Sequence, residues 1–281
     1  MQDLHQIQID PIIERALEED WGYGDWTTDL CIPKDARAKA RIIAKEPTIA
    51  AGVDVAEAVF RKVDPRLQMR AHCNNGDEVG NRGLILEIEG SARAILKGER
   101  VALNLMARMC GIAAMARKFV KELEGTSTQL LDTRKTTPGL RILEKSATVL
   151  GGARNHRFGL CDGVIVKENH IRASGGITKA LERLHDSLPP TLKIEVETTN
   201  LEEVNEALSA GADIIMLDNM SLEMMREAVA LIKGRALVEA SGNVRLENVR
   251  QVALTGVDFV STGSIIHSAR WADLSLLFEE Q

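Results

Sequence analysis

The chain has 281 residues, and its 41 acidic side chains outnumber its 35 lysines and arginines, which gives a formal net charge of −6 at pH 7. This acidic balance argues against a general nucleic-acid binder, so any basic cluster must be local. No apolar run reaches the ~18 residues that suggest a membrane span. The amino terminus lacks the basic and apolar regions of a secretory signal, and the four cysteines form no CxxC pair. We therefore expect a cytoplasmic protein with reduced thiols.

Residues 1–124 predict an N-terminal α+β domain of a sandwich-like kind. Apolar spacing predicts two helices, over Ile7–Glu19 and Val53–Lys62, and three strands, over Ala38–Ala50, Leu67–Cys73 and Leu84–Ile88. The segments WGYGDWTTD and NNGDEVGNRG are rich in turn residues and predict loops. A long helix is expected over Leu96–Leu123, with a break at Gly111 as an option.

Residues 125–267 have a regular alternation of short apolar strands and helices. Six strands are expected, within QLLDTRK, GVIVKENH, LKIEVETT, DIIMLDNM, ALVEASGN and DFVSTGS. Helical spacing follows some of them, over Leu201–Ala210, Leu222–Ile232 and Leu246–Leu254. Six strands, where a complete barrel has eight, predict an incomplete, open-faced α/β barrel. A doubly wound sheet is the alternative, and the tail 268–281 is expected to pack back on the first domain.

Each of the six expected strands ends in polar residues. The six groups are Asp132 to Lys135, Lys167 to His170, Glu195 with Glu197, Asp218 with Asn219, Glu239 with Ser241 to Asn243, and Ser261 to Ser264. Ligands of barrels and of open parallel sheets bind at the carboxyl ends of the strands. These six strand ends therefore predict one binding site.

Cations gather at the first two strand ends. Arg134, Lys135 and Lys167 follow the strands directly, while Arg154, His156 and Arg157 precede the second strand and can fold over the same mouth. Confined cations suit a substrate with several carboxylates or phosphates, which arginine grips with two parallel hydrogen bonds. The alternative is that some of them, above all Arg154 and Arg141, are surface charges or ion-pair partners.

Two acidic residues and two glycine-bearing turns complete the expected site. Glu197 and Asp218 lie at adjacent strand ends, where a carboxylate pair beside phosphates commonly holds Mg²⁺. Glu195 shares a face with Glu197 but lies farther from the strand end, and the alternative role of the acids is to pair with the nearby cations. The turns ASGN and STGS can cradle phosphates with backbone N–H groups, although each could be an ordinary turn.

The motifs DTRKTTPGLR, GGARNHRFGL, VIVKENHI, IEVE, IIMLDN, EASGN and GVDFVSTGS, in this order, resemble the quinolinate phosphoribosyltransferase family. This family is also called nicotinate-nucleotide pyrophosphorylase (carboxylating). YGDWTTD and GERVALNLMARMCGIA extend the resemblance into the first half of the chain. The chain departs from the family where Cys110 replaces a serine, where Ala153 replaces a glycine, and where the turn TGS replaces a plainer one.

The resemblance implies a reaction and an assembly. The reaction joins quinolinate to phosphoribosyl pyrophosphate with Mg²⁺ and gives nicotinate mononucleotide, pyrophosphate and CO₂ in NAD biosynthesis. The assembly is a homodimer or a higher oligomer, in which Arg100 reaches into the site of the partner subunit.

The resemblance also implies roles for single residues. The expected substrate-binding residues are Arg100, Thr133, Arg134, Lys135, His156, Arg157, Lys167, Glu197, Asp218, Ser241, Gly242, Asn243, Thr262, Gly263 and Ser264. Glu197 and Asp218 are the expected metal ligands and also support positive charge on the ribose. Lys135 is a candidate donor of the proton that replaces CO₂, with Lys167 and water as alternatives.

Three rival functions fit parts of the pattern. One is a homologue with the same fold and a changed substrate, such as the related proteins encoded beside molybdate transporters. Another is a Schiff-base aldolase that uses Lys167 as its amine. The third is a non-catalytic sensor of a phosphosugar or a dicarboxylate.

Overall fold

The computed structural model describes residues 6–279, which form two compact units. Of the described residues, the first unit takes 6–117, 136–152 and 266–279, and the second takes 118–135 and 153–265. Residues 136–152 group with the first unit, because the buried Glu144 bonds there to Arg108. The division of the sequence into domains at residues 124 and 125 stays a prediction.

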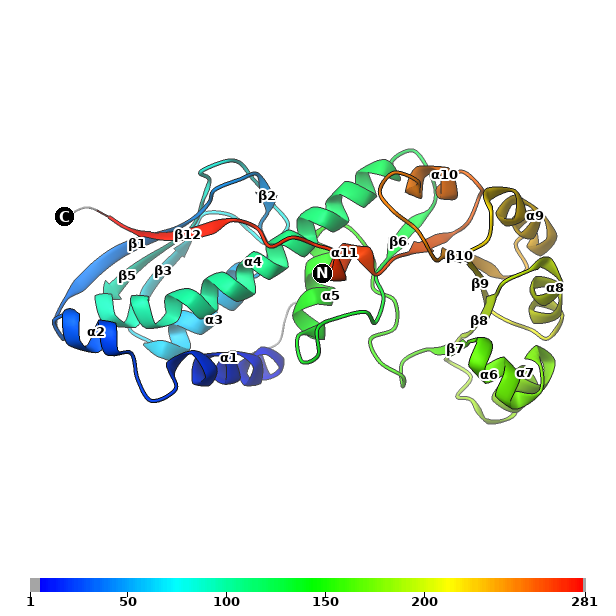
Figure 1. Ribbon diagram of the computed structural model, residues 1–281, viewed down its shortest axis with the longest axis horizontal. Helices are drawn as coiled ribbons and strands as arrows, with labels where there is room; N and C mark the ends of the chain where they lie inside the picture. The colour runs from blue at the N-terminus through cyan, green and yellow to red at the C-terminus, as the bar shows by residue number, and fades with distance from the viewer. Residues whose placement is uncertain (1–5, 280–281) are drawn as a thin grey trace. The chain divides into compact units, whose positions relative to one another are not determined.

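Eleven helices and twelve strands are found within residues 6–279 (Figure 1). The helices are α1 (Gln6–Trp21), α2 (Trp26–Cys31), α3 (Val53–Val63), α4 (Ala92–Glu122), α5 (Arg141–Leu150), α6 (Glu168–Ser174), α7 (Ile177–Ser187), α8 (Leu201–Ser209), α9 (Leu222–Ile232), α10 (Val249–Ala253) and α11 (Ser264–His267). The strands are β1 (Arg37–Ala44), β2 (Thr48–Ile49), β3 (Gln68–Ala71), β4 (Glu78–Val79), β5 (Leu84–Ser91), β6 (Gln129–Leu131), β7 (Val164–Val166), β8 (Ile194–Thr198), β9 (Ile214–Asp218), β10 (Leu237–Ser241), β11 (Phe259–Ser261) and β12 (Leu274–Phe278). Over this part of the chain, no helix combines the length and the apolar character that crossing a membrane requires.

The first unit is built on an antiparallel sheet with the strand order β12-β1-β5-β3. Strand β12, from the C-terminal tail, pairs with β1 at the edge of this sheet. Figure 1 shows α4 and α3 lying along one side of the strands. The buried face of α3 explains this packing, since Val55, Val59 and Phe60 have no exposed surface.

The second unit contains a parallel sheet with the order β6-β11-β10-β9-β8-β7. Five of its strands follow one another in chain order, and β6 pairs with β11, the last of them. A β6–β7 pair would close this sheet into a ring, but no such pair is found among residues 6–279. This is the order of a barrel opened at one seam, and the expected open-faced α/β barrel is confirmed. A doubly wound sheet would instead have its first strand near the centre.

The second unit's helices begin where the sequence provides caps. The side chain of Asn200 accepts a hydrogen bond from the backbone N–H of Glu203 at 2.9 Å and starts α8. Ser221 does the same for Met224 at 3.2 Å and starts α9. Figure 1 shows α8 and α9 on the outer side of the neighbouring strands. The expected helix Leu246–Leu254 is shorter, since α10 covers only Val249–Ala253.

Three local expectations for the first unit are wrong, and one of them is the loop expected at NNGDEVGNRG, which contains the short strand β4 paired with β2. The loop expected at WGYGDWTTD contains most of α2, because Asp25 caps this helix by accepting a hydrogen bond from the N–H of Thr28 at 2.9 Å. The single strand expected over Ala38–Ala50 is two strands, β1 and β2. Pro47 lies between them, and proline has no N–H to donate to a sheet.

Helix α4 is continuous, so the break considered at Gly111 does not occur. Glycine is required at this position for a different reason. A Cβ atom here would lie 1.9 Å from the backbone oxygen of Arg270. The segment that leads to β12 therefore passes α4 at a distance that only glycine permits.

We predict that Gly111→Ala destabilises the protein by about 1–3 kcal/mol, as overpacking usually does. Without the contact, the same change inside a helix would stabilise it by ~1 kcal/mol. Urea unfolding measures the difference, with Lys118→Ala, at an exposed position of α4, as the control. A Gly111→Ala protein as stable as the wild type would contradict the close approach.

Candidate active site

The register of the parallel sheet brings polar residues of neighbouring strands together. Glu197 aligns with Met216, Met216 with Glu239, and Asp218 with Ser241. Aligned residues in parallel strands point to the same face, as do residues two apart in one strand. Five polar residues therefore share one face of the sheet: Glu195, Glu197, Asp218, Glu239 and Ser241.

The segment 154–157 runs alongside β6 at the seam where the barrel is open. The N–H of Arg154 donates to the oxygen of Leu130 at 2.8 Å, and the N–H of Asp132 donates to the oxygen of Arg154 at 3.1 Å. The carboxylate of Asp132, which is fully buried, accepts the backbone N–H of His156 at 2.9 Å. These bonds attach the NHR motif to the carboxyl end of β6.

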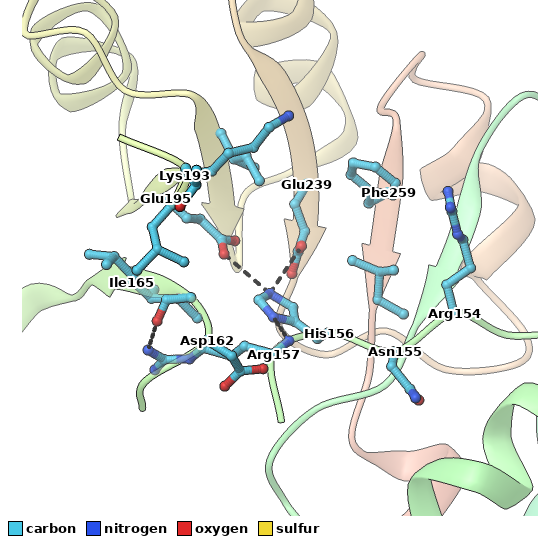
Figure 2. Close-up of a pocket in the computed structure, with 16 residues that line it drawn as sticks. Arg154, Asn155, His156, Arg157, Asp162, Ile165, Lys193, Glu195, Glu239 and Phe259 are labelled. Carbon is cyan, nitrogen blue, oxygen red and sulfur yellow. Dashed lines mark hydrogen bonds and ion pairs between the residues drawn. The ribbon is translucent and has the colours of Figure 1, made fainter. Parts of the chain in front are cut away.

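The side chain of His156 enters the polar face and meets two buried carboxylates (Figure 2). Its Nε2 lies 3.1 Å from Oε2 of Glu195 and 3.5 Å from Oε2 of Glu239. The glutamates are 3% and 1% exposed, and the remaining oxygen of each has no hydrogen-bond partner among the described residues. Burial raises the pKa of Glu195, and the charge of Glu239 adds to this effect although the bond to His156 opposes it.

The protonation of His156 follows from its second ring nitrogen. Burial lowers the pKa of His156, but the bonds to Glu195 and Glu239 outweigh burial and raise the pKa to about 10. This value favours a doubly protonated ring. However, the backbone N–H of Arg157 donates to Nδ1 at 2.7 Å, so Nδ1 is an acceptor and carries no proton. A second proton, on Nδ1, would set two N–H donors against each other, so the ring carries its one proton on Nε2.

His156, Glu195 and Glu239 also bring three potential metal-ligand atoms within 4.8 Å of one another. A histidine that binds a metal through one nitrogen donates a proton from the other. Here Nδ1 accepts a hydrogen bond, so Nε2 must keep its proton and has no lone pair for a metal. The cluster therefore does not fit a divalent ion.

A cavity of about 470 Å³ in the second unit has this cluster in its wall. Lys193, Ile214 and Phe259, which also line it, lie just before or at the amino ends of their strands. The cavity therefore extends toward the amino ends of the strands. Of the predicted substrate-binding residues, His156 and Arg157 line it.

The expected cations differ in their surroundings. Arg157 donates from Nη1 to the oxygen of Gly163 at 2.8 Å, and its buried Nε has no partner within residues 6–279. Burial, and next the charge of Arg134, lower the pKa of Arg157, so these two guanidinium groups lie close enough to repel each other. Lys167 forms an ion pair with Glu197, which is the alternative considered for this acid. Arg154 donates to Gln129 at 2.5 Å.

The remaining candidates of the second unit lie at connected strand ends. Asn219 donates to Asp218 at 2.9 Å and accepts from Asn243 at 2.8 Å. Gly242 has φ +85°, and a Cβ atom there would lie 2.4 Å from Oδ1 of Asn219. The second turn joins this group, because Ser261 donates to Ser241 at 3.1 Å. Thr262 bonds to Ser264 at 2.9 Å within that turn, and Thr133 accepts the N–H of Lys135 at 3.1 Å.

Among the predicted substrate-binding residues, Arg100 alone lies in the first unit. It is exposed on α4, and its guanidinium lies 3.9 Å from Glu99.

Sequence reasoning missed a buried ion pair that anchors the segment after β6. Arg108 of α4 donates to Glu144 of α5 at 2.8 and 2.9 Å, and also to the backbone oxygens of Ile266 and Ala269. Glu144, which has no exposed surface, accepts the N–H and the hydroxyl of Thr137 at 2.8 Å. The sequence contains one signal for this pair. Arg108 is a charged residue within the largely apolar motif GERVALNLMARMCGIA, and a buried charge needs a partner.

Comparison with known proteins decides the family. The model described as quinolinate phosphoribosyl transferase, C-terminal domain, matches residues 112–277, and the N-terminal domain model matches residues 25–110. The chain belongs to the quinolinate phosphoribosyl transferase family. The predicted family resemblance is therefore confirmed.

Known proteins of the quinolinate phosphoribosyl transferase family match this chain along almost all of its length. A probable nicotinate-nucleotide pyrophosphorylase (carboxylating) of Synechocystis sp. is 46% identical, with 96% of this chain and 92% of the relative covered. Quinolinate phosphoribosyltransferase (decarboxylating) 1b of Nicotiana tabacum is 41% identical, over 96% of this chain and 82% of the relative. The crystal structure of NadC from Streptococcus pyogenes is 39% identical, has a TM-score of 0.95 and covers 100% of both chains.

We predict that Glu144→Gln lowers the free energy of unfolding by about 3–5 kcal/mol, because it leaves the charge of Arg108 buried without a counterion. Urea unfolding is the measurement. The control is Glu223→Gln, which removes an exposed pair with Arg226 and should cost less than about 1 kcal/mol. Equal losses in both variants would show that the buried pair is not a stabilising anchor.

Proposed function

We propose that this protein is a decarboxylating quinolinate phosphoribosyltransferase. It joins quinolinate to phosphoribosyl pyrophosphate and forms nicotinate mononucleotide, pyrophosphate and CO₂, a step of NAD biosynthesis. The observation that carries this function is the match of both domain models of the family, over residues 25–110 and 112–277. The rival functions have no comparable support, and the pairing of Lys167 with Glu197 makes that amine a poor Schiff-base nucleophile.

Arg134 and Arg157 bind the carboxylates of quinolinate in this proposal. Their mutual repulsion supports it, because a bound dicarboxylate offsets two like charges held close together. The Nε of Arg157 is a buried donor without a partner among the described residues, and a ligand oxygen can satisfy it. Thr133, Lys135 and Lys167 are the further contacts proposed at the carboxyl ends of β6 and β7.

The phosphates of phosphoribosyl pyrophosphate and the metal ion bind, in this proposal, at the carboxyl ends of β8 to β11. The turns Ser241–Asn243 and Thr262–Ser264 bind phosphate groups. Glu197 and Asp218 share one face of the sheet and fit Mg²⁺, which is commonly held by one or two carboxylates together with substrate phosphates and water. When bound, the ion would neutralise charge on the leaving pyrophosphate.

The proposed reaction begins with the orientation of quinolinate and ends with the transfer of a proton to its C2 atom. The cations hold quinolinate with its ring nitrogen facing C1 of the ribose, so that the N–C1 bond forms as the C1–pyrophosphate bond breaks. Asp218 and Glu197 support the positive charge that develops on the ribose. The alkylated ring then accepts the electron pair that CO₂ leaves on C2, and a proton must reach this carbon. Lys135 is the proposed donor of this proton.

The assembly and the location remain part of the proposal. We propose a homodimer or a higher oligomer in which Arg100 enters the site of the partner subunit, consistent with its exposed position on α4. A cytoplasmic location is supported by four free cysteines, Cys31, Cys73, Cys110 and Cys161.

Turnover is the direct test of this function. Purified protein with phosphoribosyl pyrophosphate, Mg²⁺ and quinolinate should form nicotinate mononucleotide and CO₂, and chelating the metal with EDTA should stop the reaction. A parallel reaction with nicotinate, which lacks the second carboxylate, should give no product. Product from nicotinate alone would keep the phosphoribosyl chemistry but overturn the dicarboxylate pocket.

We predict that Arg134→Ala raises the KM for quinolinate by about 100-fold, the equivalent of losing ~2.7 kcal/mol of charge-assisted hydrogen bonding. Arg134→Lys should recover only part of this loss, because lysine keeps the charge but not the two-pronged grip. Steady-state kinetics with varied quinolinate measure both effects, and Arg183→Ala, at an exposed position of α7, is the control. Near-normal kinetics of Arg134→Ala would remove this residue from the quinolinate site.

A further inference from the structure

His156 connects parts of the second unit that the sheet leaves apart. Its backbone N–H is bonded to Asp132 at the end of β6, and its ring reaches Glu195 on β8 and Glu239 on β10. Figure 2 shows the ring between the two carboxylates, with Arg157 beside it. The residue therefore crosses the barrel interior from the open seam to the opposite strands.

Both ring nitrogens of His156 are occupied within the protein. Nδ1 accepts the backbone N–H of Arg157 at 2.7 Å, and Nε2 directs its proton to the carboxylates of Glu195 and Glu239. A substrate carboxylate needs a donor, and Nε2–H is the only one that this ring has. Binding substrate through Nε2–H would draw this proton away from two buried carboxylates whose other oxygens have no partner within residues 6–279.

Arg157, in contrast, is prepared for a ligand. His156 fixes its backbone on one side, and the oxygen of Gly163 fixes its Nη1 at 2.8 Å on the other. Its Nε–H is buried and has no partner within residues 6–279. A guanidinium held in place before binding loses less conformational entropy when it grips an anion.

We propose that His156 is a positioning residue that orients Arg157 for quinolinate without touching the substrate, and that Glu195 and Glu239 anchor it in this role. The proposal rests on the function proposed above and revises the direct contact that the family resemblance implies for His156. It also gives a reason for two carboxylates in the barrel interior. Their burial is unfavourable, and they are the groups that hold the imidazole ring in its orientation.

A double-mutant cycle in quinolinate affinity separates positioning from direct contact. The proteins are the wild type, His156→Ala, Arg157→Ala and the double variant, and isothermal calorimetry gives the Kd of each for quinolinate. Residues that act through one contact show non-additive effects, whereas two independent contacts multiply. If Arg157→Ala costs about 100-fold and His156→Ala about tenfold, the double variant should stay near 100-fold and not approach about 1,000-fold.

Steady-state kinetics provide a second readout that a general loss of structure would not produce. His156→Ala should raise the KM for quinolinate while the KM for phosphoribosyl pyrophosphate stays within about twofold. His156→Asn places an amide oxygen near the position of Nδ1, so it can accept the N–H of Arg157 and should recover part of the affinity. This variant also replaces His156→Ala in the cycle if the alanine protein does not fold.

The outcomes are distinct. A wild-type protein that binds no quinolinate would refute the proposed function itself. Quinolinate binding with multiplying losses would show that His156 contacts the substrate directly, and an unchanged Kd in His156→Ala would show that it does not position Arg157. Either of these two results overturns the inference while leaving the proposed function in place.

Discussion

The contact of His156 with Glu195 and Glu239 is the interaction on which the organisation of the second unit depends. The sheet is open between β6 and β7, so backbone hydrogen bonds do not join the two sides of this seam within the described residues. The segment 154–157 lies there, attached to β6 through Leu130 and Asp132. A side chain that reaches across the interior supplies the connection that a closed barrel obtains from its backbone.

The second unit brings like charges of both signs close together, although the protein as a whole is acidic. Two guanidinium groups, those of Arg134 and Arg157, are close enough to repel each other, while two carboxylates are buried deeper in the same unit. Each arrangement is unfavourable by itself. In the proposed function, an anionic substrate would relieve the first, and the proton of His156 partly satisfies the second. Both costs are therefore concentrated where a ligand is expected to bind.

Much of the fold follows from local patterns in the sequence. All six strands of the second unit lie within the predicted segments, because short apolar runs between helices are characteristic of parallel strands. Some of the errors arise where a distant contact determines the local structure. Gly111 looks like a helix breaker in the sequence, but it stands where the backbone of Arg270 approaches α4. Helix α5 is absent from the sequence-based prediction. Its Glu144 is buried against Arg108, which lies 36 residues earlier in the chain.

The sequence by itself determined the family, the barrel of six strands and the polar residues at the strand ends, because these depend on composition and order along one chain. It also predicted cations near one another, since the carboxyl ends of parallel strands meet at one edge of a sheet. Only the tertiary structure decided what each polar group bonds to. Glu195 and Glu197 are two residues apart and share a face, yet one meets His156 and the other Lys167. The contacts of β8 and β10 with His156 at the seam depend on distances between segments far apart in the chain, and spacing along the sequence does not contain those distances.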